Sequence, residues 1–89
     1  MLPPPSAKLF DVLGNPMRRV VLGRLIRRPQ SVGELAKGLP ISRPAVSQHL
    51  AALARAGLVT ARSEGWTRVY RAEVKALQPI RDWLDEVGA

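Results

Sequence analysis

The stretch Ile41-Ser-Arg-Pro-Ala-Val-Ser-Gln-His-Leu50 decides the fold, because it begins a helix with one apolar and one polar side. We expect Ser42 to cap this helix. Since the next residue but one is a proline, which has no N–H, the serine hydroxyl should accept a hydrogen bond from the amide of Ala45. The helix should continue to about Ala56 and end at Gly57. Its predicted buried side recurs at helical spacing and consists of Val46, Leu50 and Leu53.

The other side of this helix carries polar residues of the kinds that bind nucleic acids. Arginine and glutamine hydrogen-bond base edges, and serine binds bases or phosphates. Because the N-terminal residues of a recognition helix enter the major groove, the expected DNA-contacting residues are Ser42, Arg43, Ala45, Ser47, Gln48 and His49. Arg43 can bind guanine or a phosphate, and the sequence leaves both alternatives open. For His49, which has no cysteine beside it, we expect a packed or phosphate-bonding imidazole rather than a metal ligand.

A shorter helix should precede this one. Ser31 and Glu34 have the spacing of a capping box, which predicts a helix over about Val32 to Lys37, followed by a left-handed Gly38. Two capped helices joined by a tight turn are typical of a helix-turn-helix, although an ordinary small helical domain is the alternative. The residues expected to face inward are Val32, Leu35, Ala36, Leu39 and Ile41.

After Gly57 the spacing changes from helical to alternating, with β-favouring residues on either side of Glu64-Gly65-Trp66. This pattern predicts a two-stranded β-hairpin, or wing, whose reversal Gly65 permits. Three interpretations of Trp66 stay open: it packs on the DNA backbone, covers the base of the wing, or lies at a subunit contact. The wing residues expected to contact DNA are Arg62, Gly65, Trp66, Thr67 and Arg68, and Arg71 is also placed to reach a phosphate.

The N-terminal part of the chain should begin with a disordered lead-in over residues 1–5, because consecutive prolines favour an extended backbone. A helix is then expected from the cap Ser6 to Leu13. Asn15-Pro16 begins a second helix that should reach about Arg27. Its predicted inward residues are Met17, Val20, Val21, Leu25 and Ile26.

The C-terminal part should contain a turn over Val74 to Gln78 and a last helix from near Pro79, since proline disrupts a helix interior. The predicted fold is therefore mainly α with a small β-hairpin: a winged helix-turn-helix of five helices and a two-stranded wing, in one domain over residues 6–89.

The first and last helices are unusually apolar for a domain of this size. A small domain has little internal surface, so we expect these helices to form a homodimer interface. The alternative is that they pack only on each other within one chain. The expected interface residues are Leu9, Phe10, Leu13, Ile80, Trp83, Leu84 and Val87.

The charge distribution favours a polyanionic partner. Between Asn15 and Arg71 the chain has eleven lysines and arginines but only two acids, Glu34 and Glu64. Binding of such a basic section to DNA is favoured by counterion release, although an anionic membrane surface would also attract it. Cysteine is absent, which excludes disulfides, thiolate metal sites and cysteine nucleophiles. With no signal peptide and no long apolar run, a cytoplasmic protein without membrane association is expected.

Three segments resemble the ArsR family of dimeric winged-helix repressors over about Lys8 to Leu84: Leu13-Gly-Asn-Pro-Met-Arg-Arg19, Ile41 to Leu50, and Leu53-Ala-Arg-Ala-Gly-Leu-Val59. The resemblance implies a five-helix winged fold, a dimer of the terminal helices, and DNA contacts at Arg43, Ser47, Gln48 and the wing. Many members sense metals through cysteines in the helix matching Val32 to Lys37 or through histidines on the last helix. Carboxylates accompany those histidines in the family, but this chain has no cysteine and its last helix offers only Asp82, Asp85 and Glu86 without histidine, so the resemblance implies a member without the metal-sensing ligands.

The sequence as a whole predicts a homodimeric repressor that blocks a promoter by binding a pseudo-palindromic site in double-stranded DNA, with no metal or other cofactor. The alternative is a protein-interaction module whose basic winged-helix face binds an acidic partner. An enzyme is not expected, because a single histidine without a carboxylate partner at catalytic spacing provides no catalytic group.

Overall fold

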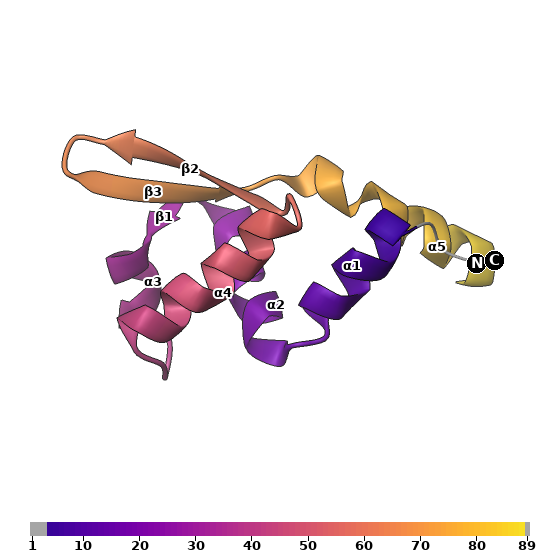
Figure 1. Ribbon diagram of the computed structural model, residues 1–89, viewed down its shortest axis with the longest axis horizontal. Helices are drawn as coiled ribbons and strands as arrows, with labels where there is room; N and C mark the ends of the chain where they lie inside the picture. Colours follow the sequence, from indigo (N-terminus) through magenta and orange to yellow (C-terminus); the bar gives the residue numbers. More distant parts are fainter. Residues whose placement is uncertain (1–3, 89) are drawn as a thin grey trace.

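The computed structural model describes residues 4–88, which form five α-helices and a small antiparallel sheet (Figure 1). Along the chain the elements are α1 (Pro4–Leu13), α2 (Pro16–Arg27), β1 (Gln30–Ser31), α3 (Val32–Lys37), α4 (Arg43–Arg55), β2 (Val59–Glu64), β3 (Thr67–Ala72), a 3₁₀ turn (Val74–Leu77) and α5 (Gln78–Gly88). The helix-turn-helix is α3–α4 and the wing is β2–β3. These two units and the five helices confirm the predicted fold.

The core lies where α4 meets α2, α3 and the start of the wing. The predicted stripe of α4 is confirmed, since Val46, Leu50 and Leu53 are completely buried. Leu35 of α3 and Leu58, just before β2, are buried equally deeply. One side of α4 is therefore fixed by apolar contacts along almost its whole length.

The prediction for α2 was partly wrong. Val21 and Leu25 are buried as expected, but Val20 and Ile26 are 43% and 50% exposed, and Leu22 is buried in their place. Apolar residues are spread around this helix, and the sides that face α4, β3 and α1 are covered while Val20 and Ile26 lie away from the core. Val21 and Leu25 are one helical turn apart and point in similar directions, and Leu22 lies at the edge of the same arc of roughly 100°.

The predicted helix starts at Asn15, Ser31 and Ser42 are confirmed. The Asn15 side chain accepts hydrogen bonds from the amides of Met17 and Arg18 at 2.9 and 3.2 Å, and the Ser42 hydroxyl accepts one from the amide of Ala45 at 3.3 Å. Ser31 and Glu34 form both bonds of the capping box. Gly57 ends α4 with φ of +77°, a left-handed conformation that favours glycine.

Gly38 does not adopt the predicted left-handed conformation, because its φ is −102°. A different constraint accounts for glycine here. Arg24 of α2 donates a hydrogen bond to the carbonyl of Gly38 at 2.9 Å, and a Cβ at this position would overlap the same guanidinium group. The turn of the helix-turn-helix is thus held directly by α2.

The first helix begins earlier than the sequence predicted. The backbone is helical from Pro4, so Ser6 lies inside α1 instead of capping it, and Pro4 and Pro5 belong to the helix and not to a disordered lead-in. Proline is tolerated in a first turn, where amides have no helical partner. The rest of the expected lead-in, Met1–Pro3, lies outside the described residues.

The sheet has three strands, with the order β1-β3-β2, where two had been predicted. In β1, Gln30 pairs with Tyr70 and Ser31 pairs with Val69. Two residues are too few to show an alternating pattern, which is why the sequence did not reveal this strand. The expected turn after the wing is a 3₁₀ turn over Val74–Leu77, and α5 begins at Gln78, one residue before Pro79.

We predict that Leu50→Ala lowers the free energy of unfolding by about 2–5 kcal/mol, because it leaves a cavity in a fully buried site. Ile26→Ala, at a half-exposed position of α2, is the control and should stay within about 1 kcal/mol of the wild type. Urea titration followed by circular dichroism measures both. Equal losses would contradict the placement of the core.

Candidate nucleic-acid interface

The N-terminal half of α4 presents a polar side that no carboxylate neutralises. Of the residues predicted to contact DNA, Ser42, Arg43, Ser47 and Gln48 are exposed, whereas Ala45 and His49 are half-buried. The helix itself contains no acid, and the one ion pair found among the side chains of residues 7–88 joins Arg28 to Glu34. This side of α4 is therefore available to a partner.

Arg43 lies against Gly33 of α3, where a side chain would shift its guanidinium group by a few tenths of an ångström. A Cβ on Gly33 would come within 3.1 Å of one Arg43 guanidinium nitrogen and 3.3 Å of its central carbon. Gly33 therefore lets Arg43 lie close to α3, a contact that sequence reasoning missed. The signal was present, because glycine is unfavourable inside a helix and can mark a close approach by another group.

A groove of about 410 Å³ joins α3, the start of α4 and the tip of the wing. We call it the wing groove. It brings Arg43 together with the predicted wing residues Trp66, Thr67 and Arg68, although they are more than twenty positions apart in the sequence. Lys37 also lines it and adds a third positive charge that the sequence analysis had not assigned to the site.

Glu34, the acid that lines the wing groove, is already hydrogen-bonded within the chain. Its carboxylate accepts hydrogen bonds from the Ser31 amide at 3.0 Å and from the Arg28 guanidinium at 3.3 Å. These two bonds, the backbone one first, lower the pKa of Glu34 below its usual value. Glu34 therefore stays ionised as part of the capping box, and its bond to Arg28 balances part of its charge. Lys37, Arg43 and Arg68 are left with a positive excess.

The wing turns at Gly65-Trp66, with Gly65 at φ of +62° and no positive φ at Trp66, as in a type II′ hairpin turn. Trp66 is fully exposed. This exposure rules out one of its three interpretations, namely that it covers the base of the wing.

Arg68 lies over the ring of Tyr70, with 5.8 Å between the guanidinium carbon and the ring centre, and this cation–π contact orients the Arg68 side chain.

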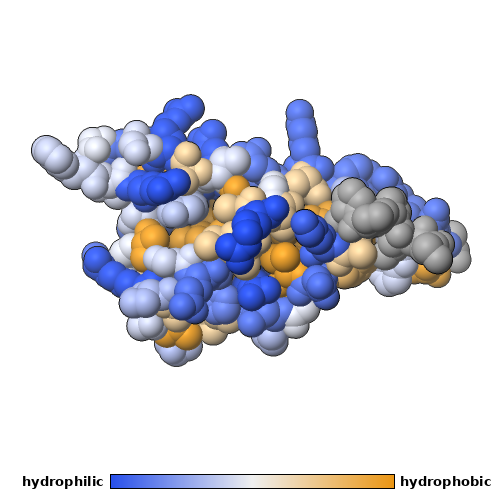
Figure 2. Space-filling model, viewed as in Figure 1, coloured by the Kyte–Doolittle hydropathy of each residue, from blue (hydrophilic) through white to orange (hydrophobic). Residues whose placement is uncertain are grey.

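Arg62 and Arg71 are the other basic residues of the wing, and both are exposed. Arg62 lies opposite Val69 in the hairpin and Arg71 lies opposite Thr60. Figure 2 shows that the wing is largely hydrophilic on the face in view, while hydrophobic residues gather toward the middle of that face. The predicted wing contacts therefore lie on a polar arm that projects beyond α3.

His49 is half-buried, and its Nδ1 atom is buried without a hydrogen-bond partner. This placement fits the packed imidazole better than a free DNA contact. Within residues 4–88, histidines and carboxylates form no group of three or more that could hold a metal ion.

The predicted interface residues on the terminal helices divide into two groups. Leu9 is only 5% exposed and belongs to the core of its own chain, so it has almost no surface to offer a partner. Leu13 and Ile80 pack partly on the same core, and the rings of Phe10 and Trp83 meet edge to face at 5.1 Å. Leu84 and Val87 remain 52% and 60% exposed. Packing within the chain thus covers one part of the apolar surface and leaves the end of α5 uncovered.

Across residues 4–88, no helix has both the length and the apolar character needed to cross a membrane.

Comparisons with known proteins agree with this geometry. Residues 13–62 match a family described as a helix-turn-helix domain. The HTH-type transcriptional regulator Rv2034 of Mycobacterium tuberculosis is 45% identical over 78 residues, which cover 88% of this chain and 73% of that protein. The transcriptional activator HlyU of Vibrio cholerae is 43% identical over 72 residues, covering 78% and 67%.

Among solved structures, an ArsR-like transcriptional regulator from Rhodococcus sp. RHA1 superposes with a TM-score of 0.82 at 36% identity, over 92% of this chain and 77% of that one. The relationship therefore covers the helix-turn-helix and most of the chain around it. The chain belongs to the ArsR family of winged helix-turn-helix transcriptional regulators, which bind DNA.

Proposed function

We propose that this regulator is a homodimeric repressor, which blocks a promoter by placing α4 of each subunit in successive major grooves of a pseudo-palindromic site. The observation that carries the proposal is the un-neutralised polar surface formed by the start of α4 and the wing groove. Ser42, Arg43, Ser47 and Gln48 contact the DNA from α4, with Ala45 placed to touch a thymine methyl group. Arg62, Gly65, Trp66, Thr67 and Arg68 contact it from the wing.

The exposed end of α5 supports the homodimer. Leu84 and Val87 lie on the same side of this helix, three residues apart, and each is more than half exposed. Together with the Phe10–Trp83 pair they form an apolar surface whose burial against a second copy is favourable. A two-fold pair sets the two copies of α4 about 34 Å apart, one turn of DNA.

Repression needs only the two surfaces described, because a dimer that occupies a promoter excludes other proteins from it. Activation requires a further contact with the transcription machinery. HlyU is named an activator, so activation is the alternative to be tested. Transcription from a promoter carrying the bound site, measured with and without the protein, decides between repression and activation. A rise in transcription would overturn the repressor proposal and leave DNA binding intact.

Arg43→Ala should weaken binding to a selected DNA fragment by about 1–3 kcal/mol. Fluorescence anisotropy titrations at two or more salt concentrations also resolve its role. If Arg43 binds a phosphate, the salt slope falls by about one, whereas loss of preference at one base pair shows that it reads a base. Arg27→Ala, at an exposed arginine in the last turn of α2, is the control and should bind like the wild type. Unchanged DNA affinity in the Arg43 variant would favour the alternative of an acidic protein partner.

Gly33→Ala should weaken DNA binding by less than Arg43→Ala does, because the new methyl group displaces the Arg43 guanidinium without removing it. Alanine is the better helix former by about 1 kcal/mol, so the loss cannot come from unfolding. Gly23→Ala in α2 gives the matched control, since nothing lies within 4 Å of the added Cβ. Gly33→Ala binding as tightly as Gly23→Ala would show that the contact does not position Arg43.

Leu84→Glu should convert the dimer to a monomer, because it places a charge in the proposed apolar interface. Sedimentation equilibrium measures the change, and binding to a full palindromic site should fall with it. Ile26→Glu is the control at a similarly exposed apolar position on α2. A Leu84→Glu protein that still sediments as a dimer would place the interface elsewhere.

A further inference from the structure

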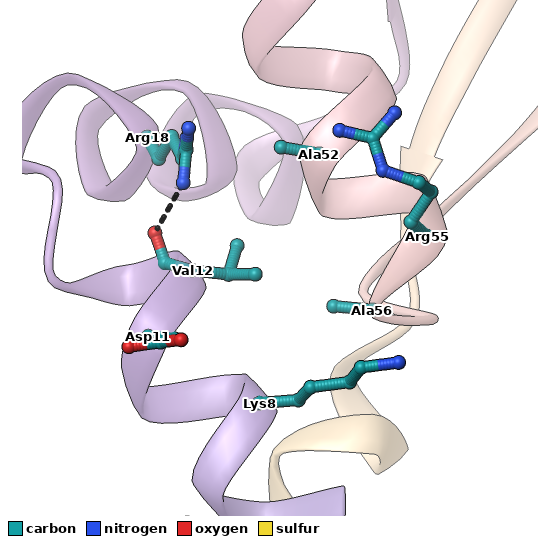
Figure 3. A pocket seen from close by; sticks show the side chains of 7 residues that line it. All are labelled: Lys8, Asp11, Val12, Arg18, Ala52, Arg55 and Ala56. Atoms are coloured by element: carbon teal, nitrogen blue, oxygen red, sulfur yellow. Dashed lines mark hydrogen bonds between the residues drawn. The ribbon is translucent and has the colours of Figure 1, made fainter.

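A second cavity lies between α1, the start of α2 and the C-terminal half of α4. Its volume is about 290 Å³, and we call it the α1–α4 hollow (Figure 3). It exists because α1 packs on α2 and α5, while the facing side of α4 carries two small residues, Ala52 and Ala56, one helical turn apart. In Figure 3 the side chains of Val12, Ala52 and Ala56 point into it from opposite walls.

The charge around the hollow is unbalanced. Lys8, Arg18 and Arg55 line it together with one acid, Asp11. Asp11 forms no ion pair with any of the three, since among the side chains of residues 7–88 the ion pair found is that of Arg28 with Glu34. A net positive charge therefore surrounds a space whose walls are partly apolar.

Arg18 adds an unmet hydrogen-bond donor. Its Nε atom is buried without a partner, and its terminal Nη1 donates one long bond of 3.5 Å to the carbonyl of Val12. An arginine donor buried without an acceptor costs free energy, and a carboxylate is the acceptor that matches its planar geometry. Because Nε itself has no exposed surface, an anion in the hollow would be bound by the terminal Nη atoms, whose one hydrogen bond within the described residues is this long one.

We propose that the α1–α4 hollow binds a small organic carboxylate, whose anionic group is held by Arg18 and Arg55 and whose apolar body rests on Val12, Ala52 and Ala56. The volume lies at the lower end of the range for small-molecule sites, which limits the ligand to a compact molecule. The site is separate from the DNA-contacting surface, so its occupancy can be tested without DNA and does not depend on the proposed repressor function.

Isothermal titration of the full chain with sodium benzoate, at constant ionic strength, tests the site. We expect saturable binding with a Kd of about 1 mM or tighter, and much weaker binding of benzamide, which has the same ring but no charge. Sodium phosphate serves as a third probe. Absence of saturable benzoate binding, or equal binding of benzamide or phosphate, would overturn the proposal.

Substitutions then locate the ligand. Arg18→Met and Arg55→Met keep an apolar stem but lose the donors, and each should weaken benzoate binding about tenfold or more. Arg27→Met, outside the hollow, is the matched control and should leave the Kd unchanged. If Arg18→Met does not fold, Arg55→Met and the space-filling Ala56→Met carry the test. Benzoate bound equally by these variants and the wild type would show that it binds elsewhere.

Discussion

The burial of one side of α4 is the constraint on which the rest of the structure depends. Val46, Leu50 and Leu53 have no exposed surface, and Leu35 of α3 lies in the same core. Because helix geometry fixes which residues share a side, burying this stripe forces Ser47 and Gln48 outward. The direction in which the polar side of α4 faces is therefore set by apolar packing.

The wing is placed by a second, smaller set of contacts. The two-residue strand β1 lies between α2 and α3 and pairs with β3, so the base of the wing is attached to the helix-turn-helix through backbone hydrogen bonds. Gln30 reinforces the junction, because its buried side-chain amide donates to the carbonyl of Arg24 at 3.1 Å. Arg24 in turn bonds the carbonyl of Gly38. One connected group of polar contacts thus fixes the wing, α2 and the turn before α4 relative to each other.

Local signals in the sequence were enough for most of this fold. Caps such as Asn15 and Ser42 act on amides two or three residues away, and the α4 stripe depends on spacing alone, so both could be read from neighbouring residues. The predictions that failed concerned contacts between residues that are distant in the sequence. The strand β1 forms through its pairing with β3, and the exposure of Val20 and Ile26 depends on where the other described elements pack against α2. The contact between Gly33 and Arg43 crosses two elements and has no periodic pattern.

The candidate site could also be predicted only in part from the sequence. Residue types on α4 and the wing indicated nucleic-acid binding, since charge and hydrogen-bonding groups are visible in the sequence. The wing groove was not visible, because its walls come from three segments. Nor did the sequence separate Leu9, which is buried in its own chain, from Leu84, which is exposed, since both read as apolar positions of amphipathic helices.

The helix α4 has different surroundings at its two ends. Arg43 lies at one end and Arg55 at the other, and the distance between them along the axis is roughly 18 Å at 1.5 Å per residue. A tilt of about 5° about the Arg55 end would displace the Arg43 end by roughly 1.5 Å, and the buried side of α4 holds the helix against such a tilt. That displacement is about half the length of a hydrogen bond, enough to take a side chain out of register with a base edge. Any contact that Arg43 makes with a partner therefore depends on how firmly the apolar core holds α4 along its length.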